Sequence, residues 1–229
     1  MEIKTNQDLI KEISIAIKSE GFYFLKDKPF DDQYCNDVIN NIDKFIEKNQ
    51  TEENFSGSEN RIWNSENKIK LINKFYDFSQ QIISKINKRE TKINNILAIR
   101  NRKVVNLIDN KNRWHIDSIS SQLKVFMFLN DTSEESGCLE FIQNTNKSFF
   151  RLIKLITPNY FINYLNPLDK FRKYDAIPDE KILKLIKKGY KTYPVIVKKG
   201  TILIINTSKL IHRARPAINS ERYALTAYI

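Results

Sequence analysis

Hydrophobic positions in the first part of the chain recur mostly at the spacing of amphipathic helices. The first such stretch has Thr5 or Asn6 available as a cap and is expected to end at Gly21. A short strand is expected at 22–25, FYFL, and a polar, loop-like segment at 51–64. Helices are expected over residues 5–21, 29–49 and 65–89.

From about residue 97 the pattern changes to short runs of β-branched and aromatic residues bounded by turn residues, which is typical of an antiparallel sandwich or barrel. An insertion at 149–188, with helix-like pieces and three prolines, interrupts these runs. The pattern predicts an α+β fold in a single domain over 1–229, mostly helical over 1–96 and mostly strands over 97–229. Strands are expected within 96–109, 122–131, 138–144, 193–200, 201–206 and 222–229.

Charge and composition narrow the function classes without assigning one. The net charge of +11 favours an acidic partner, or it reflects the general richness of the chain in Lys, Asn and Ile. Cys35 and Cys138 lack CxxC spacing, which argues against a disulfide framework or a zinc site. The charged N-terminus and the lack of an apolar run of about 20 residues predict no signal peptide and no membrane span, so a cytoplasmic location is expected.

The chain has only two histidines, His115 and His212, and they are the strongest candidates for chemistry. His115 stands two residues before Asp117 in a stretch expected to be extended, so both side chains point to one side. His212 is expected at the end of the strand that begins at 201. Two histidines and a carboxylate on one face of a metal leave positions open, as in non-haem Fe(II) enzymes that activate oxygen. A lone histidine or an HxD triplet would carry little weight; their conjunction favours the metal site.

Arg222 opens the last expected strand and shares one face of it with Ala224, Thr226 and Tyr228. A guanidinium in that position can grip a carboxylate through two hydrogen bonds, which lysine does less well. The alternative is a surface arginine in a basic protein. Its place in an inward-facing strand soon after His212 favours the carboxylate role.

Four stretches of the chain together resemble the phytanoyl-CoA dioxygenase family of Fe(II)- and 2-oxoglutarate-dependent oxygenases. The resemblance covers most of the chain, and it is the conjunction of the stretches that makes it specific. The stretches are SEGFYFLKDKPFDDQYCNDVINNI, RWHIDS, VFMFLNDTSEESGCLEFIQNTNKS and KKGTILIINTSKLIHRARPAINSERYALTAYI.

The resemblance implies a double-stranded β-helix, a cupin-like jelly roll, with N-terminal buttressing helices and the insertion at 149–188 as a helical lid. It implies that Fe(II), 2-oxoglutarate and O2 meet in the jelly roll. Arg222 would hold the distal carboxylate of 2-oxoglutarate, and Asn106 and Phe126 would line its pocket. The implied metal ligands and catalytic residues are His115, Asp117 and His212.

Some positions depart from the family pattern. Asn144, Thr145 and Asn146 stand where the family often has Gly-Ser-His, and Ala214 stands where it often has Ser, which would remove one hydrogen bond to the co-substrate. Asp117 disfavours halogenation, because the related halogenating enzymes lack this carboxylate.

The implied reaction is hydroxylation of a small organic substrate, with release of succinate and CO2. Nine basic residues against four acidic ones in the insertion indicate either a solvated basic face or an anionic substrate. The expected partner is a small molecule and not nucleic acid, and the protein is expected to be a monomer or a homodimer. The rival functions are a basic nucleic-acid-binding protein, a zinc hydrolase and a catalytically silent jelly-roll sensor.

Overall fold

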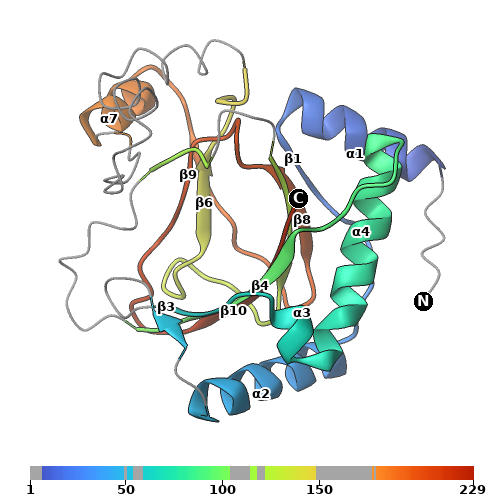
Figure 1. The fold of residues 1–229 in the computed structure, drawn as a ribbon. Helices are drawn as coiled ribbons and strands as arrows, with labels where there is room; N and C mark the ends of the chain where they lie inside the picture. The colour runs from blue at the N-terminus through green and yellow to red at the C-terminus, as the bar shows by residue number, and fades with distance from the viewer. Residues whose placement is uncertain are drawn as a thin grey trace, which may run out of the picture.

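The computed structural model describes residues 7–48, 51–53, 59–103, 114–117, 122–147, 177 and 179–229. Within these ranges two antiparallel sheets face each other, and helices lie on their outer faces (Figure 1). The architecture is therefore α+β, as the hydrophobic pattern predicts.

The helices and strands of the described residues have the following bounds. The helices are α1 (Gln7–Ser19), α2 (Asp32–Lys48), α3 (Ser65–Lys68), the 3-10 helix η1 (Lys70–Ile72), α4 (Asn73–Asn87) and α7 (Asp179–Lys187). The strands are β1 (Phe22–Phe24), β2 (Glu52–Glu53), β3 (Glu59–Ile62), β4 (Asn95–Asn101), β5 (Leu123–Phe128), β6 (Leu139–Ile142), β7 (Thr192–Pro194), β8 (Ile202–Asn206), β9 (His212–Ala214) and β10 (Arg222–Tyr228).

The two sheets differ in size. The larger sheet has the order β1-β8-β5-β10-β4-β3-β2, and the smaller has the order β7-β6-β9. A bridge between His115 and His212 adds the short extended segment 114–117 to the smaller sheet, next to β9. Every pairing between the named strands is antiparallel.

Alternation along the strands of the larger sheet creates two separate apolar layers. In β5, Val125 and Met127 join the core between this sheet and the helices, whereas Phe126 and Phe128 point into the space between the two sheets. Both faces of β5 are covered, so the strand is apolar nearly throughout rather than alternating. Residues two apart on these strands therefore share either the helix-facing side or the inner side.

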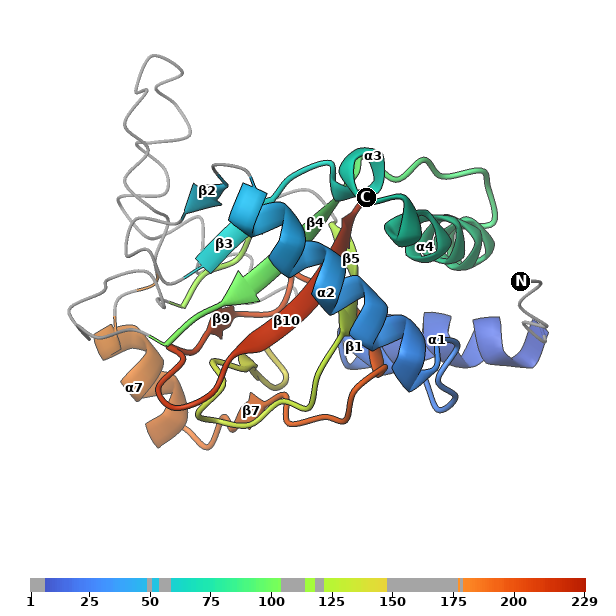
Figure 2. The ribbon, with the colours of Figure 1, turned by 90° about the horizontal axis from the view of Figure 1, so that it is seen from below.

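Helices α1, α2 and α4 cover the outer face of the larger sheet, and Figure 2 shows α2 lying across its strands. Ile13 of α1, Val38 of α2 and Phe75 of α4 are fully buried in their shared core. Each such burial stabilises the fold by about 1.5–3 kcal/mol. Helix α2 is capped by Asp31, whose Oδ1 accepts a hydrogen bond of 2.7 Å from the backbone N–H of Tyr34.

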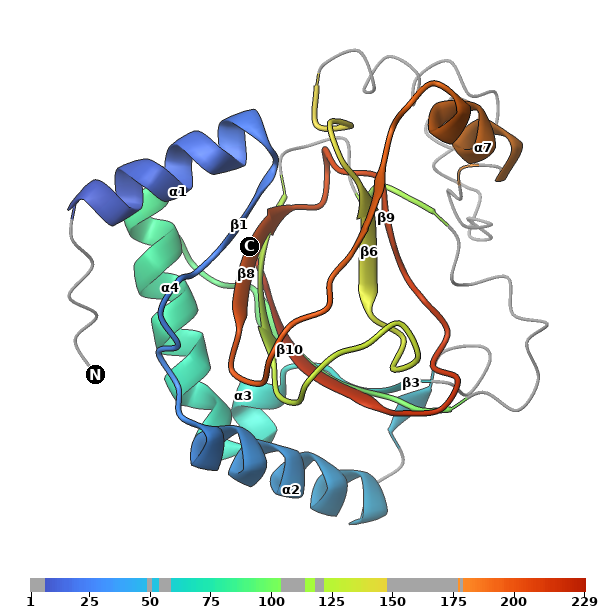
Figure 3. The ribbon, with the colours of Figure 1, turned by 180° about the vertical axis from the view of Figure 1, so that it is seen from behind.

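Helix α7 lies on the other side of the molecule, against the smaller sheet (Figures 1 and 3). Its Ile182 packs with Trp114, Ile116 and Ile211 on the outer face of that sheet. The backbone N–H of Ile177 donates to the carbonyl of Trp114 at 2.7 Å. The described end of the insertion therefore packs against the back of the segment that carries His115 and Asp117.

The structure confirms the helices predicted over 5–21 and 29–49 and corrects two other expectations. The expected helix over 65–89 is interrupted, because Ile69 is extended (φ −126°, ψ 96°) and this break buries both Ile69 and Ile72. The expectation that 51–64 is only a loop is wrong, because β3 pairs with β4 there. The polar inward residues of β3 hide its strand character in the sequence.

Neither a disulfide nor a helix long and apolar enough to cross a membrane occurs in the described ranges. Cys35 and Cys138 are buried free thiols. Burial raises the pKa of Cys35 to about 11 and also raises the pKa of Cys138. Both thiols therefore stay protonated and poorly reactive at neutral pH.

Gly137 and Gly189 form a matched pair for testing the packing of the loop before β6. Both have positive φ, 72° and 91°, which costs a residue with a side chain about 1 kcal/mol. A Cβ on Gly189 would contact nothing, whereas one on Gly137 would lie 2.7 Å from the carbonyl oxygen of Arg215 and against the amide of Asn101. In urea titrations we expect Gly189→Ala to lower the free energy of unfolding by about 1 kcal/mol, and Gly137→Ala by about 1–3 kcal/mol more. Equal losses would contradict the tight backbone contact.

Candidate metal centre

His115 and His212 are direct neighbours across the edge of the smaller sheet. The backbone N–H of each donates to the carbonyl of the other, at 2.9 Å in both directions. Such a reciprocal pair places both side chains on the same face, and the two ring centroids lie 4.4 Å apart. On its other side His212 pairs with Phe141 of β6, so its position is fixed from both neighbours.

Asp117 completes the group, because alternation returns its side chain to the face of His115. Its backbone N–H donates to the carbonyl of Thr207 at 3.1 Å. Oδ1 lies 3.5 Å from Nε2 of His115, and Oδ2 lies 3.5 Å from Nε2 of His212. One ligand atom from each of the three residues lies within 4.8 Å of the other two, so the group could hold a metal ion.

The hydrogen bonds of His212 select the tautomer that a metal ligand needs. Nδ1 lies 2.9 Å from the carbonyl oxygen of Leu210, which only accepts, so this nitrogen carries the ring hydrogen. Burial lowers the pKa of His212, which favours the neutral ring. Nε2 then presents a lone pair to the carboxylate of Asp117, which is also an acceptor. A cation between the two groups would satisfy both of them.

Asp117 is ionised in spite of its burial. Burial alone would raise the pKa of its carboxyl group, but the pKa is held well below its usual range; because His212 is neutral, the cation in direct contact that favours the ionised form is Lys124. The side chain of Asp117 is 19% exposed and that of His115 is 37% exposed, whereas that of His212 is buried. The group is therefore closed on the His212 side and open on the His115 side.

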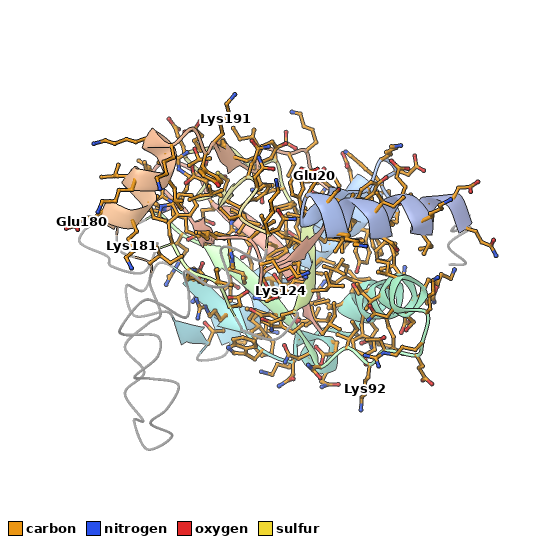
Figure 4. The ribbon with its side chains drawn as sticks, turned by 90° about the horizontal axis from the view of Figure 1, so that it is seen from above. Glu20, Lys92, Lys124, Glu180, Lys181 and Lys191 are labelled. Carbon is orange, nitrogen blue, oxygen red and sulfur yellow. The ribbon has the colours of Figure 1, made fainter. Side chains whose placement is uncertain are left out.

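Lys124 of β5 brings a buried cation to the same place. Its Nζ lies 2.8 Å from Oδ2 of Asp117 and 4.2 Å from the centre of the Tyr228 ring. Figure 4 shows Lys124 in the middle of the molecule, whereas Lys92 and Lys191 lie at its periphery. Burial alone would lower the pKa of Lys124, but Tyr228 and Asp117 outweigh it and the pKa is raised. The ammonium group is therefore charged at neutral pH.

Arg222 is buried on the inner side of the larger sheet, where β10 pairs with β4. Its Nη2 lies 3.9 Å from Oε1 of Glu59, and Arg61 binds the other oxygen of Glu59 through Nε and Nη2, at 3.0 and 2.7 Å. Nε of Arg222 has no hydrogen-bond partner within the described part of the chain. Burial lowers the pKa of Arg222. A buried guanidinium with an unused donor is suited to binding an anion.

The other predicted site residues are placed as follows. Phe126 lies opposite Thr226 in the strand register and is buried between the two sheets. Arg222, Ala224, Thr226 and Tyr228 alternate with residues of the helix-side core, as the strand pattern predicts. Asn106 lies outside the described residues. The structure thus brings His115, Asp117 and His212 together and places Arg222 and Phe126 on the inner side of the larger sheet.

The expectation that His212 ends the strand beginning at 201 is wrong. Strand β8 ends at Asn206, the chain turns, and His212 opens β9 in the other sheet. Thr145 links the residue before β9 to the end of β6. Its Oγ1 accepts a hydrogen bond from the backbone N–H of Ile211 at 3.0 Å and donates one to the carbonyl of Ile142 at 2.7 Å. One of the residues that depart from the family pattern therefore positions the strand of His212.

The sequence reasoning missed Lys124 and Glu59. A signal for Lys124 exists, because it stands two residues before Phe126 in a strand that is otherwise almost entirely apolar. A lysine on the inner face of such a strand needs a buried partner. Glu59 follows a stretch without a strand pattern, so the sequence carries no comparable signal for it.

Comparison with known proteins identifies the fold through structure and not through sequence. No protein-family model matches the chain, so the resemblance to the phytanoyl-CoA dioxygenase family is not confirmed, and a search of curated protein sequences also finds no match. Solved structures of non-haem 2-oxoglutarate-dependent enzymes do superpose on nearly the whole chain, at low sequence identity.

Three of these structures serve as examples of the similarity. The epimerase SnoN in complex with Fe3+, α-ketoglutarate and nogalamycin RO has a TM-score of 0.69 at 10% identity, over 97% of this chain and 84% of that chain. HygX from Streptomyces hygroscopicus with nickel and 2-oxoglutarate bound has a TM-score of 0.62 at 12% identity, over 95% and 85%. A prolyl hydroxylase from Trichoplax adhaerens, in complex with a hypoxia inducible factor peptide, has a TM-score of 0.61 at 13% identity, over 98% and 90%.

The metal-binding capacity of the centre can be tested without any turnover. We expect the protein to bind one Co(II) ion per chain, and His212→Ala to weaken that binding by at least about 100-fold because one of three donors is lost. Isothermal titration calorimetry measures the affinity. Asp131→Asn, which changes an exposed carboxylate paired with Lys198, serves as the control and should bind like the wild type. Equal affinity in His212→Ala would show that the ion binds elsewhere.

Proposed function

We propose that this protein is an Fe(II)- and 2-oxoglutarate-dependent dioxygenase that hydroxylates a small, anionic organic substrate. The observation that carries the proposal is the convergence of His115, Asp117 and His212 on the inner side of a two-sheet fold. The solved structures with similar folds include an epimerase, a carbocyclase and a prolyl hydroxylase. Hydroxylation is therefore the reaction proposed for this chain and not one taken from a single relative.

The proposal takes the two sheets to be a double-stranded β-helix. The chain supports this because it passes repeatedly from one sheet to the other. Strand β4 belongs to the larger sheet, the segment 114–117 to the smaller, β5 to the larger, and β6 and β7 to the smaller. Strands β8, β9 and β10 then alternate between the sheets. This winding is what draws the three candidate ligands to one end of the interior.

The donor set fits Fe(II). Two imidazole nitrogens and one carboxylate on one face would leave positions for oxygen and an oxo acid. A zinc hydrolase would also need a general base beside the metal-bound water. Among the residues that the structure describes, the carboxylate at this centre is that of Asp117, which is itself in the donor set and is paired with Lys124. The geometry therefore favours the iron enzyme over the hydrolase.

Two buried polar groups on β10 fit a dianionic co-substrate. Nε of Arg222 and Oγ1 of Thr226 are buried without hydrogen-bond partners among the described residues. Leaving such groups unpaired lowers the stability of the fold unless a ligand forms the missing hydrogen bonds. Arg222 and Arg61 place two guanidinium groups around the carboxylate of Glu59. In the proposal Arg222 holds the distal carboxylate of 2-oxoglutarate, and Phe126 and Asn106 line the pocket.

The chemistry that iron would supply here is activation of O2 coupled to conversion of 2-oxoglutarate to succinate and CO2, with one oxygen atom delivered to the substrate as a hydroxyl group. The residues of the chain prepare that chemistry. The Leu210 carbonyl keeps Nε2 of His212 available as a donor atom. Lys124 helps to keep Asp117 ionised, and the aromatic core around Phe126 excludes water from the inner side.

The substrate class is proposed from charge and from size. The chain carries a net charge of +11, and α7 carries Lys181, Lys184 and Lys187 against Asp179 and Glu180. Two similar structures hold small molecules, nogalamycin RO in SnoN and hygromycin B in HygX. A small anionic metabolite fits both observations. None of the described residues singles out a CoA-linked acyl group.

Two other functions make different predictions. A nucleic-acid-binding protein would use the positive charge but would leave the buried His212 and Arg222 without a role. A catalytically silent sensor would bind the same metal and oxo acid without turning them over. Turnover assays therefore separate the enzyme from both.

Anaerobic reconstitution followed by exposure to oxygen tests the proposed activity. We expect Fe(II) and 2-oxoglutarate to give a weak visible charge-transfer band, and oxygen to yield succinate slowly even without substrate. His212→Ala should lose both signals, because the metal is no longer held. Wild-type protein that shows the band but forms no succinate would be the silent sensor.

The role of Arg222 has its own test. We expect Arg222→Lys to raise the 2-oxoglutarate concentration needed for half-maximal succinate formation by about tenfold or more. Lysine keeps the positive charge but cannot form the bidentate pair of hydrogen bonds to a carboxylate. Arg215→Lys is the matched control, since Arg215 pairs with Glu134 at 2.6 Å in a partly exposed position. It should behave like the wild type. An unchanged 2-oxoglutarate requirement in Arg222→Lys would refute the assignment.

A further inference from the structure

Lys124 places a positive charge directly against one of the three candidate metal ligands. Its Nζ is 2.8 Å from Oδ2 of Asp117, and the side chain is only 7% exposed. Strand pairing sets Tyr228 on one side of Lys124 and Ile205 on the other. Among the described residues, Asp117 is the one carboxylate in ion-pair contact with this ammonium group. Without a metal ion, the positive charge of Lys124 and the negative charge of Asp117 cancel.

A divalent ion held by His115, Asp117 and His212 would upset that balance. It would add two positive charges beside an ammonium group that shares its single counter-charge with the ion. Burial leaves little water to screen the repulsion, so like charges interact more strongly here than at the surface. The ion, Asp117 and Lys124 together would carry two positive charges. A 2-oxoglutarate dianion carries two negative charges and would cancel them.

We propose that Lys124 couples the two binding events: it weakens binding of the metal alone and strengthens binding of a dianionic 2-oxo acid to the metal-loaded protein. This inference rests on the proposed function, because the metal and the oxo acid are those of the same centre. Lys124 acts through its charge and through Asp117, so it is a positioning residue. The metal would then be held tightly only together with its co-substrate.

The test is a pair of anaerobic calorimetric titrations with Mn(II), which replaces iron without redox chemistry. Metal affinity is measured with and without saturating 2-oxoglutarate, and the ratio of the two affinities is the coupling. Lys124→Gln keeps an N–H donor for Asp117 and removes the charge. We expect this variant to bind Mn(II) alone about tenfold more tightly. The ratio of its Mn(II) affinities with and without 2-oxoglutarate should be about tenfold smaller than in the wild type.

Two further variants separate charge from shape. Lys124→Met is a second neutral side chain of similar length, and it should behave like Lys124→Gln. Lys124→Arg keeps the charge and should keep the wild-type coupling. Thermal melts recorded with bound Mn(II) establish which variants are folded, and either neutral variant is sufficient for the test.

Pyruvate distinguishes Lys124 from Arg222, because it is a 2-oxo acid without a distal carboxylate. With pyruvate in place of 2-oxoglutarate, we expect Lys124→Gln still to reduce the coupling, whereas Arg222→Lys should have no effect on it. An effect of Lys124→Gln that is seen only with 2-oxoglutarate would place Lys124 at the distal carboxylate and overturn the inference.

Failure of the inference is distinguishable from failure of the proposed function. Wild-type coupling retained in folded Lys124→Gln or Lys124→Met would overturn the role of Lys124 and leave the oxygenase assignment standing. Wild-type protein in which 2-oxoglutarate does not tighten Mn(II) binding at all would count against the assignment and the inference together.

Discussion

The reciprocal backbone pair between His115 and His212 is the contact on which the candidate centre depends. It joins segments that are far apart along the chain and sets both imidazoles on one face, and alternation then brings Asp117 to the same face. Apolar contacts support the pair from behind, because α7 packs with Trp114 and Ile116 on the outer face of the smaller sheet. Helix α7, at the described end of the insertion, thus supports the site by packing.

Buried charge is the second constraint on the interior. Asp117 is paired with Lys124, and Glu59 with Arg61 and Arg222, all of them on the inner side of the larger sheet or facing it. Bringing such groups out of water costs several kcal/mol per ion, and apolar residues of similar volume often serve stability as well or better. These pairs are therefore weak contributors to the fold. Their position beside the candidate ligands and on β10 is the one that the proposed binding of charged ligands requires.

The two layers of the structure differ in content: one is an apolar core, and the other holds the candidate site residues. Helices α1, α2 and α4 and the outer face of the larger sheet form the larger apolar core. The space between the two sheets contains an aromatic cluster around Phe126 and Phe141, and Lys124, Arg222 and Thr226 lie on the inner side of the larger sheet. Because side chains alternate, one strand such as β10 can serve both layers. Substitutions on the inner face can change ligand binding while the helix-side core remains intact.

Local patterns in the sequence determined the helices over 5–21 and 29–49, the strand character of the second half and the shared face of His115 and Asp117. These features depend on the period of side chains along a single segment, which is visible in one dimension. Only the tertiary structure decided that His212 opens β9 in the opposite sheet, that 59–62 is a strand paired with β4 and that Lys124 meets Asp117. Each of these depends on which distant segments become neighbours, because a polar residue takes a buried position only where another chain segment supplies its partner.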